Sequence, residues 1–276
     1  MKSINFIMHA LSPLHSGAGI STGHIDLPIV RSVSTEMPFI PSSTVKGVLR
    51  GRSDLFKCED TNNKEKYLFG TAYDDDSGSK SGVLAFSDAN LLVLPVKANP
   101  GVVAYVTCPF ILHRFAREFN LHFDPIKFEK DALCSFDVDS IQLQNFELSA
   151  KTANQAKDIA KEISSRAFTQ EIERKDFESR FLIVNDEYFS HFSKYCTEVR
   201  AHIAINKETG TVNKDLGALW YEESLPAESL LYGVIGVDIR AQAQGKVSIN
   251  EATSTKRIQI GKNFTKGFGQ VNIVLG

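Results

Sequence analysis

Cysteine is scarce in this sequence of 276 residues, and its four copies, Cys58, Cys108, Cys134 and Cys196, lie far apart. Structural zinc sites use cysteine or histidine pairs at short spacing, and small disulfide-linked domains contain cysteine at much higher density. A chain of this length can also bury a core large enough to fold without such links. We therefore expect neither a disulfide framework nor a structural zinc site, and we predict a reduced, cytoplasmic chain.

The first residues lack the features of an export signal or a membrane span. The segment MKSINFIMHALSPLH has one lysine and a short apolar run, which Asn5 and His9 interrupt. Such a run is too short to cross a bilayer, and no clear cleavage pattern follows it. We interpret the segment as the first strand of a protein that has no membrane partner.

The chain also lacks an excess of positive charge, because its net charge is −2, whereas simple nucleic-acid-binding proteins are usually basic. The charge is unevenly distributed, however. Residues 1–52 carry five Lys/Arg and two Asp/Glu (+3), and residues 252–276 carry four Lys/Arg and no acid (+4), which leaves −9 for residues 53–251. Two basic ends would suit a polyanion groove if they meet in space. A random fluctuation in charge is an equally good explanation.

Motifs of the common hydrolases and nucleotide-binding proteins are missing. The sequence contains no GxSxG, no HExxH, no GxxxxGK[ST] and no neighbouring Cys/His nucleophile. Paired carboxylates such as Glu222-Glu223 are present, but their spacing alone has no specificity.

The pattern of apolar residues predicts an α+β fold with mostly antiparallel sheets in a single domain, residues 1–276. Strands and helices alternate without βαβ regularity, and no repeat of fixed period appears. Ser42 or Ser43 is expected to cap a helix that begins near Thr44, and Asn185 or Asp186 to cap a helix running toward Tyr195. Further helices are predicted at 110–119 and 154–168, and strands at 4–11, 83–86, 91–96, 102–107, 179–184, 230–239 and 268–275.

Two segments interrupt this pattern. Strands at 199–205 and 218–222 flank Glu208-Thr209-Gly210, which indicates a hairpin. Residues 57–82 are polar and contain Asp74-Asp75-Asp76, so we expect a flexible insertion there. The acidic triplet could bind a divalent ion, although a solvated loop is the more common use of such a run.

The C-terminal segment IQIGKNFTKGFGQV is the most informative part of the sequence. A predicted strand enters a loop that contains Gly261, Gly267 and Gly269, together with Lys262 and Lys266. Glycines let backbone N–H groups approach phosphates closely, and lysines supply positive charge. An ordinary glycine-rich hairpin explains the same segment equally well.

A second informative segment joins the first strand to the first helix. Asp26 lies between apolar residues, where a carboxylate is unexpected unless it is paired or functional. Near RNA it could bind Mg²⁺, or it could position or deprotonate a 2′-hydroxyl. His15 could contact phosphate or assist proton transfer. From these residues alone, a loop cap and a surface histidine are the more common roles, and a metal site at His24 and Asp26 would need further ligands.

Taken together, these segments resemble the RAMP superfamily of CRISPR-associated proteins. The resemblance rests on LHSGAG, HIDLPIVR, IPSSTVKGVLR and IGKNFTKGFGQV, in that order along the chain. The middle of the chain resembles one branch, the repeated backbone subunit of the type III-B complex, in LFG, GVLAFSDA, VAYVTCPF, TEVR, ETGTV, GALWYEE and LPAESLLY. One departure is the terminal loop, which begins IGKNF where this family often has paired glycines.

The resemblance implies a modified ferredoxin-like (RRM-type) palm with inserted finger and thumb elements. The thumb would fall within residues 199–222. Several copies would stack along the guide RNA (crRNA) together with other subunits of the type III-B complex, and each thumb would displace one base pair of the guide–target duplex.

The resemblance also implies roles for individual residues. Asp26 matches the catalytic aspartate that cuts target RNA with a divalent metal, which we expect to be Mg²⁺, and His15 matches the loop histidine. The residues that match the guide-backbone grip are Ser42, Ser43, Lys46, Gly47 and Arg50, and those of the terminal loop are Gly261, Lys262, Lys266 and Gly267.

The leading hypothesis is therefore a metal-dependent endoribonuclease that acts on target RNA within an assembled complex. A non-catalytic RNA-binding subunit is the first alternative. A RAMP endoribonuclease that processes the guide precursor without metal is the second alternative, and the matches in the middle of the chain disfavour it.

Overall fold

The computed structural model describes residues 3–21, 23–58, 63–71, 80–205, 209, 219–238, 247–249 and 255–276. Most strands within these ranges join one large sheet: β1 (Ser3–Ala10), β2 (Phe39–Ile40), β4 (Leu84–Phe86), β5 (Ala89–Asn99), β6 (Val103–Thr107), β7 (Ala132–Cys134), β8 (Ser140–Leu143), β9 (Phe146–Thr152), β10 (Phe181–Val184), β13 (Leu230–Val237), β15 (Thr255–Gln259) and β16 (Gln270–Leu275). Their order is β15-β16-β1-β13-β5-β6-β10-β7-β9-β8, with β2 beside β5 and β4 beside β13.

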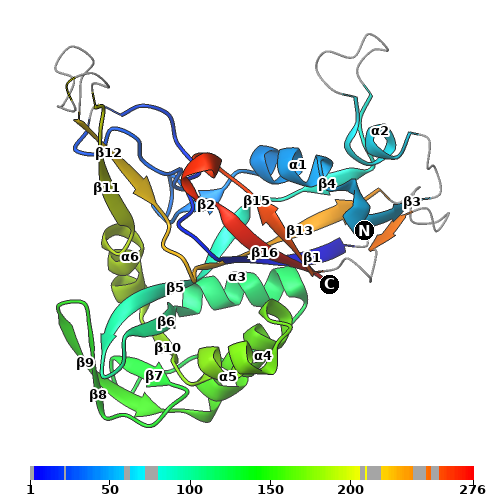
Figure 1. Ribbon diagram of the computed structural model, residues 1–276. Coiled ribbons are helices and arrows are strands. Elements are labelled where there is room, and N and C mark those ends of the chain that lie inside the picture. The colour runs from blue at the N-terminus through cyan, green and yellow to red at the C-terminus, as the bar shows by residue number, and fades with distance from the viewer. Residues whose placement is uncertain are drawn as a thin grey trace.

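Two smaller sheets and six α-helices complete the described fold. The sheets pair β11 (Glu198–Ile203) with β12 (Leu219–Ser224), and β3 (Phe56–Cys58) with β14 (Val247–Ile249). The helices are α1 (Ser42–Arg50), α2 (Lys64–Phe69), α3 (Pro109–Phe119), α4 (Asn154–Ala167), α5 (Glu171–Glu178) and α6 (Asp186–Tyr195). In Figure 1, α3, α4 and α5 gather in the lower part of the molecule, α1 lies above the large sheet, and the β11–β12 hairpin projects at the upper left.

Strand β1 is buried along most of its length within the large sheet. Strand β1 pairs antiparallel with both β13 and β16, and all of its residues from Phe6 to Ala10 are buried. Phe6 lies opposite Gly233 of β13, and a Cβ atom built on that glycine would lie 2.4 Å from the Phe6 ring. The glycine is needed because the aromatic ring occupies the space of its missing side chain. This packing fixes the ends of β1 and β16, where the loops of the candidate site begin.

The prediction of an α+β fold with mostly antiparallel pairing is confirmed. Among the described strands of the large sheet, the β6–β10 and β7–β9 pairs are parallel and the other pairs are antiparallel. The predicted helices at 110–119 and 154–168 correspond closely to α3 and α4. Within the described ranges, no helix has both the length and the apolar character needed to cross a membrane.

The predicted cap of α1 is wrong, whereas that of α6 is confirmed. Helix α1 already begins at Ser42, with Pro41 in the N-cap position. The carboxylate of Asp88 accepts a hydrogen bond from the Ser42 backbone N–H at 2.7 Å, so a distant residue satisfies a donor that a local cap would otherwise bind. In α6, Asn185 accepts from the Tyr188 N–H at 2.9 Å, as a local N-cap does.

The predicted insertion at 57–82 is described only in part. Its described residues include α2, in which Leu68 and Phe69 are buried in the core. Residues 74–76, the acidic triplet, lie outside the described residues, as do residues 208 and 210 of the predicted hairpin tip. The two strands that flank this tip do pair antiparallel, as β11 and β12.

Candidate nucleic-acid interface

Asp26 lies on a loop that folds back on itself like an irregular hairpin. We call this segment, residues 14–21 and 23–31, the Asp26 loop. The Ala18 N–H donates to the Pro28 carbonyl at 2.9 Å, and the Val30 N–H donates to the Ser16 carbonyl at 2.8 Å. These cross-loop bonds satisfy backbone groups without a regular sheet, and they bring the two arms of the loop together, with Asp26 near the turn.

The Asp26 loop is bonded to strand β12 at the base of the β11–β12 hairpin. The Tyr221 N–H donates to the Asp26 carboxylate at 2.8 Å. One residue further on, the Leu27 N–H donates to the Tyr221 carbonyl at 3.1 Å, and the Glu223 N–H donates to the Leu27 carbonyl at 3.0 Å. Leu27 thus forms a parallel bridge with Glu222. The bonded oxygen of Asp26 is Oδ2, and within the described chain Oδ1 forms no hydrogen bond.

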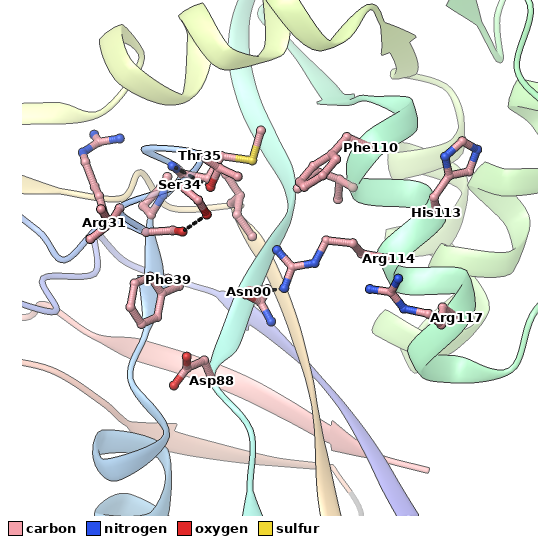
Figure 2. A pocket seen from close by; sticks show the side chains of 16 residues that line it. Arg31, Ser34, Thr35, Phe39, Asp88, Asn90, Phe110, His113, Arg114 and Arg117 are labelled. Atoms are coloured by element: carbon pink, nitrogen blue, oxygen red, sulfur yellow. Dashed lines mark hydrogen bonds between the residues drawn. The ribbon is translucent and has the colours of Figure 1, made fainter.

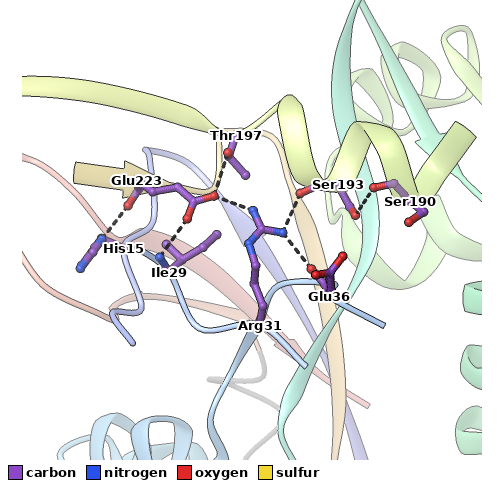
Figure 3. A network of polar contacts seen from close by, with 8 residues as sticks. All are labelled: His15, Ile29, Arg31, Glu36, Ser190, Ser193, Thr197 and Glu223. Carbon is purple, nitrogen blue, oxygen red and sulfur yellow. Dashed lines mark hydrogen bonds and ion pairs between the residues drawn. The ribbon is translucent and has the colours of Figure 1, made fainter. Parts of the chain in front are cut away.

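The buried carboxylate of Glu223 holds the second arm of the loop (Figure 3). Glu223 is 3% exposed. It accepts hydrogen bonds from the Ile29 N–H at 3.1 Å, the Arg31 guanidinium at 2.5 Å and the Thr197 hydroxyl at 2.9 Å. Arg31 also donates to the Ser193 carbonyl at 3.0 Å. A buried charge with this many partners is well satisfied, and it ties the Asp26 loop to β12 and to α6.

His15 lies at the other end of the loop and is almost fully buried. Its Nδ1 lies 2.6 Å from the Glu223 carbonyl oxygen, which can only accept, so Nδ1 carries a proton. In the neutral ring Nε2 therefore has the free lone pair. Nδ1 is also 3.5 Å from the Glu222 carboxylate, to which the side-chain amide of Asn263 donates. The exposed fraction of His15 is only 2%, so this conformation leaves little of the ring open to a phosphate, and its role stays a prediction.

A groove of about 510 Å³ lies beside His15 and joins three segments that are distant in the sequence. It is lined by His15, Ser16, Gly17, Pro41, Thr44, Gly47, Val48, Gly261 and Lys262. These residues come from the Asp26 loop, helix α1 and the C-terminal loop. The two basic ends of the chain therefore do meet, which is the condition under which their charge could serve a polyanion.

The C-terminal loop packs directly on the Asp26 loop. The Lys262 N–H donates to the His15 carbonyl at 3.0 Å. Gly261 has φ +89°, and a Cβ atom built on it would lie 2.4 Å from that carbonyl oxygen. Only glycine fits here, because both the backbone conformation and the close contact exclude a side chain. Lys266 and Gly267 are exposed on the short 3₁₀ turn that follows, outside the residues that line the groove.

Helix α1 contributes fewer of the predicted RNA-binding side chains than the sequence suggests. Of the predicted residues on this helix, Gly47 lines the groove, and no described atom lies within 4 Å of the position of a Cβ on it. The Arg50 guanidinium donates to the carbonyls of Phe69 and Gly70, both at 3.1 Å, and so ties α1 to the end of α2. The other predicted residues, Ser42, Ser43 and Lys46, are partly or fully exposed on α1 but do not line the groove.

The sequence model of one protein family, described as the RAMP superfamily, matches residues 7–272. The chain belongs to the RAMP superfamily. One relative, the CRISPR system Cmr endoribonuclease Cmr4 of Pyrococcus furiosus, is 32% identical over 289 residues, which cover 100% of this chain and 96% of the relative. The resemblance to the type III-B branch is thereby confirmed.

Solved structures share this fold. Oligomeric Cmr4 from Pyrococcus furiosus matches with a TM-score of 0.73 and 25% identity, over 100% of this chain and 98% of that one. A chain of the type III-B Cmr-beta complex bound to cognate target RNA matches with a TM-score of 0.75 and 19% identity, over 100% and 97%. At 19% identity, the second match shows a shared fold but not a shared function.

Sequence reasoning missed the central part that β12 plays in this RAMP site. Glu222 and Glu223 are adjacent, and both are buried. Neighbouring residues of a strand point to opposite faces, so two adjacent carboxylates at the buried end of a strand require partners on both faces. The structure supplies them: Asn263 on Glu222 and Arg31 on Glu223. The signal was present in the sequence as Trp220-Tyr221-Glu222-Glu223, but the partners are too distant in the chain to be predicted.

Proposed function

We propose that this chain is the RNA-binding backbone subunit of a type III-B CRISPR complex and that it cuts target RNA. Several copies would stack along the guide RNA beside the other subunits of the complex. The proposal is supported by the full-length similarity to the Cmr endoribonuclease Cmr4 and by the similarity to a Cmr4 that crystallised as an oligomer.

One structural observation carries the proposal. The Asp26 loop connects the groove at His15 to the base of the β11–β12 hairpin at Asp26. The groove would hold the RNA backbone beside the part of the loop that contains His15. The hairpin would displace a base pair beside the part that contains Asp26. This arrangement would bring the phosphodiester beside the displaced nucleotide toward the carboxylate.

The chemistry that suits a single carboxylate is activation of a 2′-hydroxyl. Asp26 Oδ1 would accept the hydroxyl proton while the Tyr221 N–H holds Oδ2, so that the carboxylate has one fixed and one free oxygen. The 2′-oxygen would attack the adjacent phosphorus as the bond to the 5′-oxygen breaks; a 2′,3′-cyclic phosphate would form, and the departing 5′-oxygen would take a proton from water to become a hydroxyl. His15, whose Nδ1–H is held by the Glu223 carbonyl, would offer Nε2 as a second proton acceptor if the ring becomes exposed.

Dependence on Mg²⁺ is a further part of the proposal, with Asp26 as its protein ligand. Within the described residues no group of three or more His, Cys, Asp or Glu side chains could hold a metal ion. The described part of the chain therefore does not form a complete cage, but one carboxylate together with RNA phosphate oxygens is a common environment for Mg²⁺. A bound ion would neutralise charge that develops on the phosphate.

We assign the family's architecture to the structure as follows. The antiparallel order β16-β1-β13-β4, with α1 between β1 and β4 along the chain, supports a ferredoxin-like palm. The β11–β12 hairpin supports a thumb within residues 199–222. The continuous large sheet supports a single domain over 1–276.

The decisive experiment is cleavage of target RNA by the reconstituted complex, with wild type or Asp26→Asn, in Mg²⁺ or in chelator. Evenly spaced cuts that disappear in the variant, while guide binding remains, are the expected result. The matched substrate control carries a single 2′-deoxynucleotide at one cut site, which should remove only that cut.

Two outcomes would favour the alternatives. Unchanged cuts with Asp26→Asn would make the chain a non-catalytic RNA-binding subunit. Cleavage of guide-precursor RNA by the chain alone in chelator would instead identify a processing enzyme.

A further inference from the structure

A second hollow, larger than the groove, lies between α3, the first residues of β5 and the segment 31–39 (Figure 2). Its volume is about 800 Å³. We call it the α3 cleft. Helix α3 contributes Phe110, His113, Arg114 and Arg117 to its wall, and Asn90 of β5 lies at its floor.

The arginines of α3 keep their charge available to a ligand. Arg114 donates to the neutral amide oxygen of Asn90 at 3.3 Å, and in the described part of the chain neither Arg114 nor Arg117 forms an ion pair. The other charged residues of the cleft are already engaged. Arg31 is paired with buried Glu223, and the Asp88 carboxylate binds the Ser42 N–H. The hydrogen bond from the Ser42 N–H does not neutralise Asp88, but the two arginines without ion pairs outweigh this single carboxylate, so the cleft has a net positive charge.

This charge is unexpected from the position of α3 in the sequence. Residues 53–251 carry a net charge of −9, yet three basic side chains of α3 face one hollow. Helical periodicity explains the clustering, because residues 110, 113, 114 and 117 lie three or four positions apart and share one face. The opposite face of α3 packs into the core through Leu112, Phe115 and Phe119.

An aromatic ring stands beside the arginines. Phe110 is 37% exposed, whereas its neighbour Ile111 is buried. The Arg114 guanidinium carbon lies 5.9 Å from the centre of the Phe110 ring. The Phe110 N–H donates to the Asp186 carboxylate at 3.0 Å, which holds the start of α3 in place. An exposed ring beside unpaired cations is the combination that single-stranded nucleic acids use, with bases on the ring and phosphates on the cations.

We propose that the α3 cleft binds a segment of single-stranded RNA, with phosphates at Arg114 and Arg117 and one base stacked on Phe110. This inference rests on the proposed function, since it adds a second contact region to an RNA-binding chain. The cleft and the groove are neighbours: Phe39 lines the cleft, Pro41 lines the groove, and Asp88 of the cleft binds the first residue of α1. We therefore place one RNA strand in both hollows.

The position of the ring favours RNA over an acidic protein surface. Carboxylates would pair with Arg114 and Arg117 but would leave Phe110 without a stacking partner. The Asn90 amide, whose N–H groups can donate, also suits a base edge, and the hydroxyls of Ser34 and Thr35 suit a ribose or phosphate.

The test measures binding of a fluorescent single-stranded RNA oligonucleotide to the full chain over a range of salt concentrations. Arg114→Gln/Arg117→Gln should weaken binding and lower the slope of log K against log salt by about 1.4, at about 0.7 per phosphate contact. Phe110→Leu should weaken binding about tenfold with little change in that slope, because it removes stacking and no charge.

The matched control is Lys157→Gln/Lys161→Gln, which removes the same charge from α4, and it should bind like wild type. Thermal melting of each variant excludes unfolding as the cause. Cleft variants that bind RNA like wild type, while Lys262→Gln in the groove weakens binding, would overturn the cleft and leave the proposed function standing. If the cleft variants alter self-association alone, the cleft is a protein interface and the inference is wrong. Absence of RNA binding by wild type and by the assembled complex would overturn the proposed function itself.

Discussion

The guanidinium of Arg31 lies 2.5 Å from the carboxylate of Glu223, and this pair joins the Asp26 loop to strand β12. The Glu223 side chain is 4% exposed and that of Arg31 is 21% exposed, so the pair is largely removed from water. Loss of one partner of a buried pair leaves an uncompensated charge, which costs much more than the loss of a surface pair.

Arg31→Ala is therefore expected to lower the free energy of unfolding by about 3 kcal/mol. The matched control is Arg52→Ala, because Arg52 pairs with Asp54 at 2.9 Å but both side chains are more exposed, 29% and 49%. The control should cost less than about 1 kcal/mol. Urea denaturation of both variants measures the difference, and equal effects would contradict a structural role for the Arg31–Glu223 pair.

A second prediction concerns the contact of the C-terminal loop with His15. Gly261→Ala should destabilise this loop strongly, since its Cβ would lie 2.4 Å from the His15 carbonyl oxygen and its φ is +89°. Gly267→Ala, at φ +82° with no described atom within 4 Å of the Cβ position, should cost only about 1 kcal/mol from backbone strain. Chemical denaturation of the two variants separates close contact from strain; the prediction fails if Gly267→Ala costs as much as Gly261→Ala.

A third prediction tests the charge of the groove. Lys262→Gln should reduce affinity for single-stranded RNA and lower the salt slope by about 0.7, the value for one phosphate contact. Lys97→Gln, on the exposed side of β5 and away from the groove, is the matched control and should leave both unchanged. Fluorescence anisotropy at several salt concentrations provides the measurement. An unchanged slope for Lys262→Gln would mean that this lysine contacts no phosphate.

The fourth prediction is that stability depends on pH through the contact between His9, near the end of β1, and Glu228. The hydrogen bond from His9, 2.7 Å away, holds the pKa of Glu228 below its usual value of 4.5, although burial opposes this shift. A carboxyl group whose pKa is lowered by folding stabilises the native state above its unfolded pKa, and it loses that contribution as the pH falls through the folded value. Wild type should therefore lose stability below about pH 4.5 more steeply than Glu228→Gln.

Urea denaturation at about pH 6 and about pH 3.5 measures this difference. Glu147→Gln, at an exposed position of β9, serves as the control and should lose stability in parallel with wild type. Parallel loss in Glu228→Gln would show that the His9–Glu228 bond does not contribute.

The sequence predicts the parts of the fold in which local pattern and burial agree. Helices α3 and α4 bury one face each, so their apolar residues recur at helical spacing, and β1 is buried along most of its length. Strands β7, β8 and β9 and helix α5 were not predicted. Strands β8 and β9 and helix α5 mix apolar with polar residues, whereas β7 is apolar but only three residues long. The position of β7 depends on its partner β10, which local sequence does not reveal.

The same limit applies to the candidate site. Motif matching located Asp26, His15, Gly261 and Lys262, and the structure brings the last three of these to one groove. It could not show that Arg50 is engaged with α2, nor that β12 carries two buried carboxylates. Both findings depend on which distant residues surround a charge, and this is decided by tertiary packing.

The parallel bridge between Leu27 and Glu222 has a consequence for the position of the Asp26 carboxylate along the β11–β12 hairpin. Two backbone hydrogen bonds set the register of the Asp26 loop against β12: the Leu27 N–H donates to the Tyr221 carbonyl, and the Glu223 N–H donates to the Leu27 carbonyl. A residue inserted between Asp26 and Leu27 would leave these two bonds in place but would shift the carboxylate by about 3.3 Å along an extended chain and turn it to the opposite face. The position of the carboxylate relative to the hairpin therefore depends on the number of residues between Asp26 and the bridge at Leu27.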